Sequence, residues 1–179
     1  MKKSQVFWFT GLSGSGKTTL AIKLKEKLEY AEYKVKLIDG DDVREKLHRN
    51  LGFTEEDIKK NNDLITQLCL DIFGEYDVIL VPIISPYRVS RLAARNKIGE
   101  SFHEVYISAK IETVVKRDTK GLYRKAMNGE IVNMIGYSPE SIYEKPIKSD
   151  LKIDTDKMNL VDSIEIFYKF ILNQLISRD

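Results

Sequence analysis

The chain has 179 residues, and its 29 Lys and Arg against 27 Asp and Glu leave a formal net charge of +2 at pH 7. That length fits one domain with a small lid, and it is too short for two full domains. A hydrophobic fraction of 42% and a charged fraction of 31% exclude a disordered or fibrous chain. Nucleic-acid binders carry a clear basic excess, so we expect no nucleic-acid partner.

The sequence contains neither a membrane segment nor a disulfide framework. The first apolar run, residues 6–9, is too short for a signal peptide, and no window approaches the roughly 18 apolar residues of a membrane span. The single cysteine, Cys69, has no second thiol to pair with, so we interpret it as a buried core residue. We therefore expect a cytoplasmic protein with no membrane partner.

Apolar patterns predict strands and helices that alternate along the chain. The continuous apolar run at residues 6–9 is typical of a strand buried on both faces of a parallel sheet. In chain order we expect a strand at 6–9, a helix at 17–30, a strand at 35–39, a helix at 55–73, a strand at 76–84, a helix at 88–97, a strand at 102–107, a helix at 111–117, a strand at 151–154 and a helix at 160–175.

One region lacks this regularity. From residue 118 to residue 148 the periodicity fades and Gly, Pro and charged residues become frequent, which predicts a mobile loop region with a short helix at 122–127. The alternation elsewhere implies right-handed βαβ units around a parallel sheet of five strands. We expect an α/β fold with one domain over residues 1–179 and a lid at about 117–148.

The first predicted strand leads into a phosphate-binding sequence. The peptide GLSGSGKT at residues 11–18 fits the P-loop pattern G-x-x-x-x-G-K-[ST]. Glycines let backbone N–H groups approach phosphates, and the following helix directs its positive dipole end to the same place. Lys17 can reach the β- and γ-phosphates, and the Thr18 hydroxyl can bind Mg²⁺. The alternative is a glycine-rich turn that matches by chance. The expected nucleoside triphosphate ligands are Gly11, Ser13, Gly14, Ser15, Gly16, Lys17, Thr18 and Thr19.

Carboxylates follow the second predicted strand in the peptide DGDD. Phosphoryl transfer to an alcohol needs a carboxylate that orients the hydroxyl and accepts its proton, and it needs a site for Mg²⁺. We assign Asp41 to the hydroxyl and Asp39 to the Mg²⁺ shell. The alternative is that Asp41 or Asp42 caps the helix that contains Val43. Arg44 can grip an anionic acceptor through its guanidinium group, or it is an ordinary solvated arginine.

The motifs together resemble one enzyme family. The peptides FWFTGLSGSGKTT, DGDDVR, LGFT, ISPYR, RDTKGLY and IDT begin at residues 7, 39, 51, 84, 117 and 153, in the order found in adenylylsulfate kinases. The resemblance implies a P-loop kinase-like three-layer sandwich with a mobile lid. It also implies transfer of the γ-phosphate of ATP, with Mg²⁺, to the ribose 3′-hydroxyl of adenosine 5′-phosphosulfate (APS). Sulfate assimilation and a homodimer are implied as well.

The same resemblance implies roles for individual residues. Phe53 stacks on the acceptor base, and Ser85 corresponds to a serine that carries a phosphoserine intermediate in the family, although direct in-line transfer needs no covalent step. The implied acceptor site comprises Asp41, Arg44, Phe53, Asn61, Ile84, Ser85, Arg88 and Lys120. Arg117 and Lys120 close over the phosphates, and Asp154 and Thr155 lie near the ATP base. Without the resemblance, residues 117–125 read as an exposed basic loop.

Two positions depart from the family pattern. Ile58 stands where members usually carry an arginine, and Met134 stands where an aromatic usually covers the acceptor base; Lys59 and Lys60 are nearby cations. These changes favour, as an alternative, the same reaction on another nucleotide such as a cytidine diphosphoramidate. A third hypothesis is a non-catalytic nucleotide-sensing module.

Overall fold

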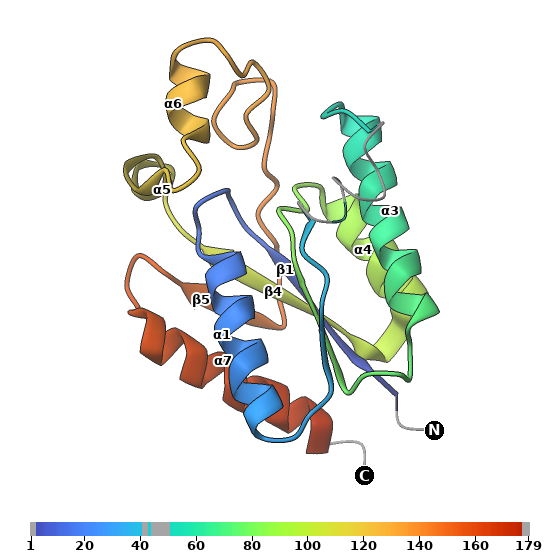
Figure 1. Cartoon of the computed structure of the whole chain (residues 1–179). Helices are drawn as coiled ribbons and strands as arrows, with labels where there is room; N and C mark the ends of the chain where they lie inside the picture. The colour runs from blue at the N-terminus through green and yellow to red at the C-terminus, as the bar shows by residue number, and fades with distance from the viewer. Residues whose placement is uncertain (1–2, 41–42, 44–50, 177–179) are drawn as a thin grey trace.

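The computed structural model describes residues 3–40, 43 and 51–176, and a parallel sheet lies at its centre (Figure 1). The sheet has five strands in the order β2-β3-β1-β4-β5. The strands are β1 (Gln5–Thr10), β2 (Val35–Leu37), β3 (Val78–Pro82), β4 (Phe102–Ser108) and β5 (Leu151–Asp154). All the strand pairs are parallel, as the continuous apolar runs predicted.

Helices cover both faces of the sheet. On one face α1 (Lys17–Tyr30) packs beside α7 (Leu160–Ile176), and on the other α3 (Glu55–Asp71) packs beside α4 (Arg88–Ile98). Alternate side chains of β1 therefore enter two separate cores: Phe7 and Phe9 face α1 and α7, while Val6 and Trp8 face α3 and α4. The expected three-layer α/β arrangement is confirmed.

The predicted elements agree with the structure except at a few ends. The strands expected at residues 35–39 and 76–84 are shorter than predicted. Their apolar runs continue because Ile38 and Ile83 are buried in the core beneath α3 and α4, although both residues follow the ends of their strands. Cys69 is buried in the same core, and burial raises the pKa of its thiol to about 12, which confirms the interpretation as a core residue.

A third cluster of apolar side chains lies outside the sandwich. Helix α5 (Ile111–Arg117) leads into the lid region, and α6 (Leu122–Met127) lies within it, where a short helix was expected. The buried members of this cluster are Leu12, Ala109, Val114, Tyr123 and Met134. The lid therefore packs on Leu12, a residue of the phosphate-binding loop. In the part of the chain that the structure describes, no helix is long and apolar enough to cross a membrane.

The carboxyl ends of the strands place the functional loops together. In Figure 1 the loop after β1, the loop after β3 and the lid all lie at the same end of the sheet. Parallel strands all point their carboxyl ends to one edge, and ligands of open α/β sheets bind beyond that edge. This edge is where a functional site is expected.

Phe167 is the clearest test of the core beneath α1 and α7. Its side chain is fully buried and its ring lies 5.0 Å from that of Phe9, whereas its neighbour Ile166 is 43% exposed. We expect Phe167→Ala to reduce the free energy of unfolding by about 3–5 kcal/mol, because it leaves a cavity in a packed core. The matched control Ile166→Ala should cost less than about 1 kcal/mol. Denaturant unfolding measures both, and equal losses would contradict the assigned core.

Candidate functional site

A cavity of about 1140 Å³ opens at the carboxyl edge of the sheet, between the phosphate-binding loop, α3 and the lid. It exceeds the roughly 300–1,000 Å³ of a typical single-ligand pocket, so it has room for two substrates. Most of the residues expected from the sequence line it: Ser13, Gly14, Ser15, Gly16, Lys17, Thr18, Thr19, Asp39, Phe53, Asn61, Ile84, Ser85, Arg117, Lys120 and Thr155.

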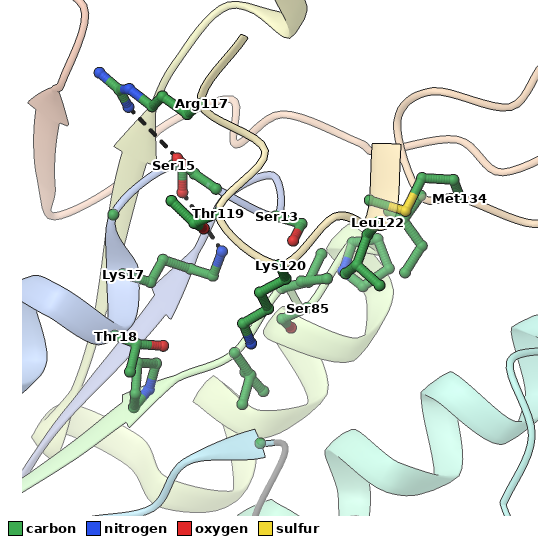
Figure 2. A pocket seen from close by; sticks show the side chains of 18 of the residues that line it. Ser13, Ser15, Lys17, Thr18, Ser85, Arg117, Thr119, Lys120, Leu122 and Met134 are labelled. Atoms are coloured by element: carbon green, nitrogen blue, oxygen red, sulfur yellow. Dashed lines mark hydrogen bonds between the residues drawn. The ribbon is translucent and has the colours of Figure 1, made fainter. Parts of the chain in front are cut away.

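Lys17 lies at the centre of the phosphate-binding loop. Its side chain is buried, and its ammonium group donates hydrogen bonds to the carbonyl oxygens of Gly11 at 2.9 Å and Leu12 at 2.7 Å. A longer contact of 3.4 Å to the Ser15 hydroxyl is drawn in Figure 2. The loop turns through Gly16, whose φ of 101° is accessible mainly to glycine. The amino end of α1 follows at once, so a buried cation and a helix dipole both face the cavity.

Thr18 and Asp39 meet across the same part of the cavity. The Thr18 hydroxyl donates a hydrogen bond of 3.3 Å to the Asp39 carboxylate, which joins the start of α1 to the end of β2. Hydroxyl and carboxylate oxygens are the ligands that Mg²⁺ prefers, and Mg²⁺ usually takes its remaining ligands from water and substrate phosphates. This pair therefore fits the predicted metal site. Among the described residues no cluster of three or more His, Cys, Asp or Glu side chains is available to hold a metal.

Arg117 fastens the start of the lid to the phosphate-binding loop. Its guanidinium group donates to the Thr155 hydroxyl at 3.0 Å, to the Thr155 carbonyl at 2.7 Å and to the Gly14 carbonyl at 3.5 Å. The Thr155 hydroxyl in turn lies 3.1 Å from the Ser15 carbonyl oxygen. The structure thus joins Arg117 and Thr155, two residues that the sequence analysis placed at the site separately, and Figure 2 shows Arg117 above the loop.

The opposite half of the cavity is less charged. Ile58 and Met134, the two departures from the family pattern, both line it and are buried. Lys59 instead pairs with Glu55 on the outer surface of α3, and it is not among the lining residues. Among the residues that the structure describes, the lining cations are Lys17, Arg117 and Lys120. Figure 2 shows Lys120 reaching from the lid toward Ser85.

Ser85 has an unusual backbone and an enclosed side chain. Its φ of +42° is in the left-handed region, which disfavours a residue with a Cβ, and it is 3% exposed. Within the described residues its hydroxyl has no hydrogen-bond partner. Its carbonyl, in contrast, accepts from the Arg91 guanidinium at 2.6 Å and lies 3.1 Å from the Thr10 hydroxyl, whose one proton it shares with the Ile84 carbonyl at 2.8 Å. The backbone of Ser85 is therefore held in place from two sides.

Other residues expected at the site lie elsewhere. Gly11 does not line the cavity, but its carbonyl accepts a hydrogen bond from Lys17. Asp154 does not line the cavity either, and its carboxylate accepts from the Asp156 N–H at 3.2 Å. Arg88 is exposed and donates to the Lys145 carbonyl at 2.8 Å, away from the lining. Asp41 and Arg44 lie outside the described residues, so their roles stay predictions.

Several lining residues were missed by the sequence analysis. They come from α3, the lid, the segment between β5 and α7, and the first turn of α7, and include Asn62, Leu122, Ile131, Asn133, Met158 and Ser163. Tyr123 was also missed: its hydroxyl donates to the Ser13 carbonyl at 3.0 Å, and burial raises the pKa of this phenol, which keeps it a donor. The available signal was the RDTKGLY peptide, which contains both Leu122 and Tyr123; the other missed residues belong to no motif.

Comparisons with known proteins agree with this geometry. The family model described as adenylylsulphate kinase matches residues 3–154. A probable adenylyl-sulfate kinase of Archaeoglobus fulgidus is 46% identical over 154 residues, which cover 86% of this chain and 97% of the relative. An adenylyl-sulfate kinase of Halothermothrix orenii is 45% identical over 166 residues, 90% of this chain and 86% of the relative. The structure of the APS kinase of Mycobacterium tuberculosis in complex with AMPPNP and APS has a TM-score of 0.88 at 31% identity, covering 97% of this chain and 99% of that one.

Gly11 provides a test of the loop geometry. A Cβ at this position would lie 2.4 Å from the Ile107 carbonyl oxygen, so Gly11→Ala must displace the backbone that holds Lys17. We expect the affinity for Mg·ATP, measured by calorimetry, to fall at least about tenfold. Gly129→Ala is the control, because it also places an alanine at a positive φ, of 76°, but a Cβ there meets nothing within 4 Å. Unchanged affinity in Gly11→Ala would contradict the role assigned to this carbonyl.

Proposed function

This chain belongs to the adenylylsulfate kinase family, and we propose that it transfers the γ-phosphate of ATP to the ribose 3′-hydroxyl of APS, forming 3′-phosphoadenylyl sulfate and ADP. The observation that carries this proposal is the single cavity in which a P-loop and an acceptor pocket face each other beneath one lid. The likeness to a kinase structure that holds both AMPPNP and APS supports it.

The donor half binds ATP through the phosphate-binding loop. Backbone N–H groups of the loop and the amino end of α1 hold the phosphates, and Lys17 balances the charge of the β- and γ-phosphates. Arg117 closes over the phosphates, and Thr155, to which it is hydrogen-bonded, lies near the base. Thr18 and Asp39 would hold Mg²⁺, which neutralises charge on the phosphates when it is bound.

The acceptor half presents the ribose hydroxyl to the γ-phosphate. Asp41 orients the 3′-hydroxyl and accepts its proton while the new O–P bond forms and the bond from the γ-phosphorus to the bridging oxygen breaks, which releases ADP. Phe53, which is 63% exposed at the cavity lining, stacks on the acceptor base, and Lys120 approaches the phosphates from the lid. The lid excludes water, which would otherwise hydrolyse ATP.

One observation favours a second acceptor. The wall that contains Ile58 and Met134 is apolar, and Lys59 is paired on the outer surface of the molecule. A pocket built this way offers less charge to a phosphosulfate than the family pattern does. The same transfer to another nucleotide, such as a cytidine diphosphoramidate, is therefore the second candidate function.

The wider setting follows from the same proposal. We infer that the protein acts in sulfate assimilation, because a kinase that makes an activated sulfate donor serves that route. We also propose a cytoplasmic location and, by analogy with the family, a homodimer. Light scattering on the purified protein tests the dimer, and a monomeric mass would contradict it.

A panel of acceptors tests the reaction. With Mg·ATP, ADP should form in the presence of APS and much more slowly with a cytidine diphosphoramidate or with no acceptor, because only the true acceptor places a hydroxyl in line. Coupled detection of ADP measures all three rates. Turnover with the cytidine compound alone would select the second candidate, and no turnover with any acceptor would favour a nucleotide-sensing module.

Asp41→Ala provides the control for this panel. The variant should lower kcat by about 10²–10⁴ while the affinity for ATP stays nearly unchanged, because a general base acts on the acceptor rather than on the donor. Asp42→Ala is the matched variant and should retain most activity. Equal activity of Asp41→Ala and the unmodified protein would refute the assigned base.

Ile58→Arg tests whether the acceptor half lacks a cation. Ile58 is 6% exposed and lines the cavity, so a longer side chain at this position can extend into the space for the acceptor. A charged contact to the phosphosulfate should lower the KM for APS by about 10- to 100-fold. Ile58→Gln introduces a shorter polar side chain without charge and should leave that KM within about threefold. An unchanged KM in Ile58→Arg would show that charge at this position does not limit binding.

A further inference from the structure

The lid rejoins the body of the protein at Tyr143, Glu144 and Lys145, a segment we call the lid root. Its backbone and side chains bond to the loop between β3 and α4. The Glu144 N–H donates to the Pro86 carbonyl at 3.0 Å, and the Glu144 carboxylate accepts from the Arg88 N–H at 2.6 Å. The Lys145 carbonyl accepts from the Arg88 side chain. The root is therefore fixed to the same loop that carries Ser85.

Arg91, in the first turns of α4, joins this root to two other parts of the fold. Its guanidinium group donates to the Glu104 carboxylate of β4 at 2.7 Å, to the Ser85 carbonyl at 2.6 Å and to the Glu144 carbonyl at 2.7 Å. The side chain is 2% exposed, and the Glu104 side chain is 12% exposed. The planar guanidinium is suited to such a junction, because its five N–H groups point in fixed directions.

A second set of hydrogen bonds, through Tyr143 and Thr10, also connects the lid root to the loop that carries Ser85. The Tyr143 hydroxyl and the Thr10 hydroxyl are 2.8 Å apart, and Thr10 lies 2.8 Å from the Ile84 carbonyl and 3.1 Å from the Ser85 carbonyl. Burial raises the pKa of the Tyr143 phenol, so it stays protonated and can donate to Thr10. Thr10 then gives its own proton to one of these carbonyls. The end of β1, the acceptor-side loop and the lid root are thus bonded together.

We propose that Arg91 and Tyr143 are positioning residues for the acceptor: Arg91 holds Ser85 in its left-handed backbone conformation, and both side chains fix the lid root, so that both walls of the acceptor half keep their shape. Ser85 lines the cavity, and so do residues 130–135 of the lid, whereas Arg91 and Tyr143 are absent from the lining. The donor half is fastened separately, through Arg117 and Thr155. This inference rests on the proposed kinase function.

Two arginines on α4 make a matched pair for the test. Arg95 lies one turn after Arg91 and also bonds to a carboxylate, that of Asp150, but its side chain is 34% exposed and it reaches neither Ser85 nor the lid root. Arg91→Lys keeps the positive charge beside Glu104 but loses the planar guanidinium group that donates to three acceptors at once. We expect it to raise the KM for APS about tenfold and the ratio of ATP hydrolysis to phosphoryl transfer severalfold, with the KM for ATP within about twofold. Arg95→Lys should leave all three values within about twofold.

The outcomes separate the inference from the proposed function. If the unmodified protein does not turn over APS, the proposed function fails; if it does and Arg91→Lys leaves the KM for APS unchanged, the inference fails. An equal rise in both KM values would indicate a general structural defect and would also overturn the inference. Should Arg91→Lys not fold, Tyr143→Phe decides: it removes only the bond to Thr10, and it should raise the KM for APS by about two- to fivefold without changing the KM for ATP. No rise would overturn the inference.

Discussion

Five parallel strands that end at one edge of the sheet determine where every functional loop of this protein lies. The loops after β1, β2 and β3 and the residue after β5 all face one cavity, because no other edge collects the carboxyl ends of parallel strands. Thr18 meets Asp39 across 21 positions of sequence for this reason. Arg117 meets Thr155 in the same way. The direction of the strands therefore determines which side chains meet at the site.

The two halves of the cavity are built by different means. The donor half depends on backbone groups, the buried Lys17 and the dipole of α1, all of which recognise phosphate rather than a particular base. The acceptor half depends on side chains from α3, the β3–α4 loop and the lid, and its wall includes Ile58 and Met134. Selectivity among acceptors therefore resides in the half that the lid and α3 shape, whereas any P-loop kinase shares the other half.

Sequence patterns predicted the fold closely, and most of the phosphate-loop residues that they singled out line the cavity. Apolar runs and helical spacing located the strands and helices, and the P-loop peptide located Lys17 and Thr18 within the cavity lining. Such features are local in sequence, so they can be predicted without the fold. The position of Arg88 against the lid root and the lining by residues 130–135 depend on contacts across more than 40 residues of chain. The hydrophobic periodicity of a sequence carries no information about such long-range contacts. For this reason the acceptor half was predicted less completely.

Leu12 has a consequence for protein engineering. It belongs to the phosphate-binding loop, yet its side chain packs in the lid cluster, where a Cβ on Gly136 would come within 2.3 Å of it. A chimera that takes residues 117–148 from a relative therefore has to import a side chain of matching shape at position 12, since packed apolar surfaces tolerate changes of volume poorly. The unit of exchange in this fold is the lid together with the buried residues outside it that complete its cluster: Leu12, Ala109 and Val114.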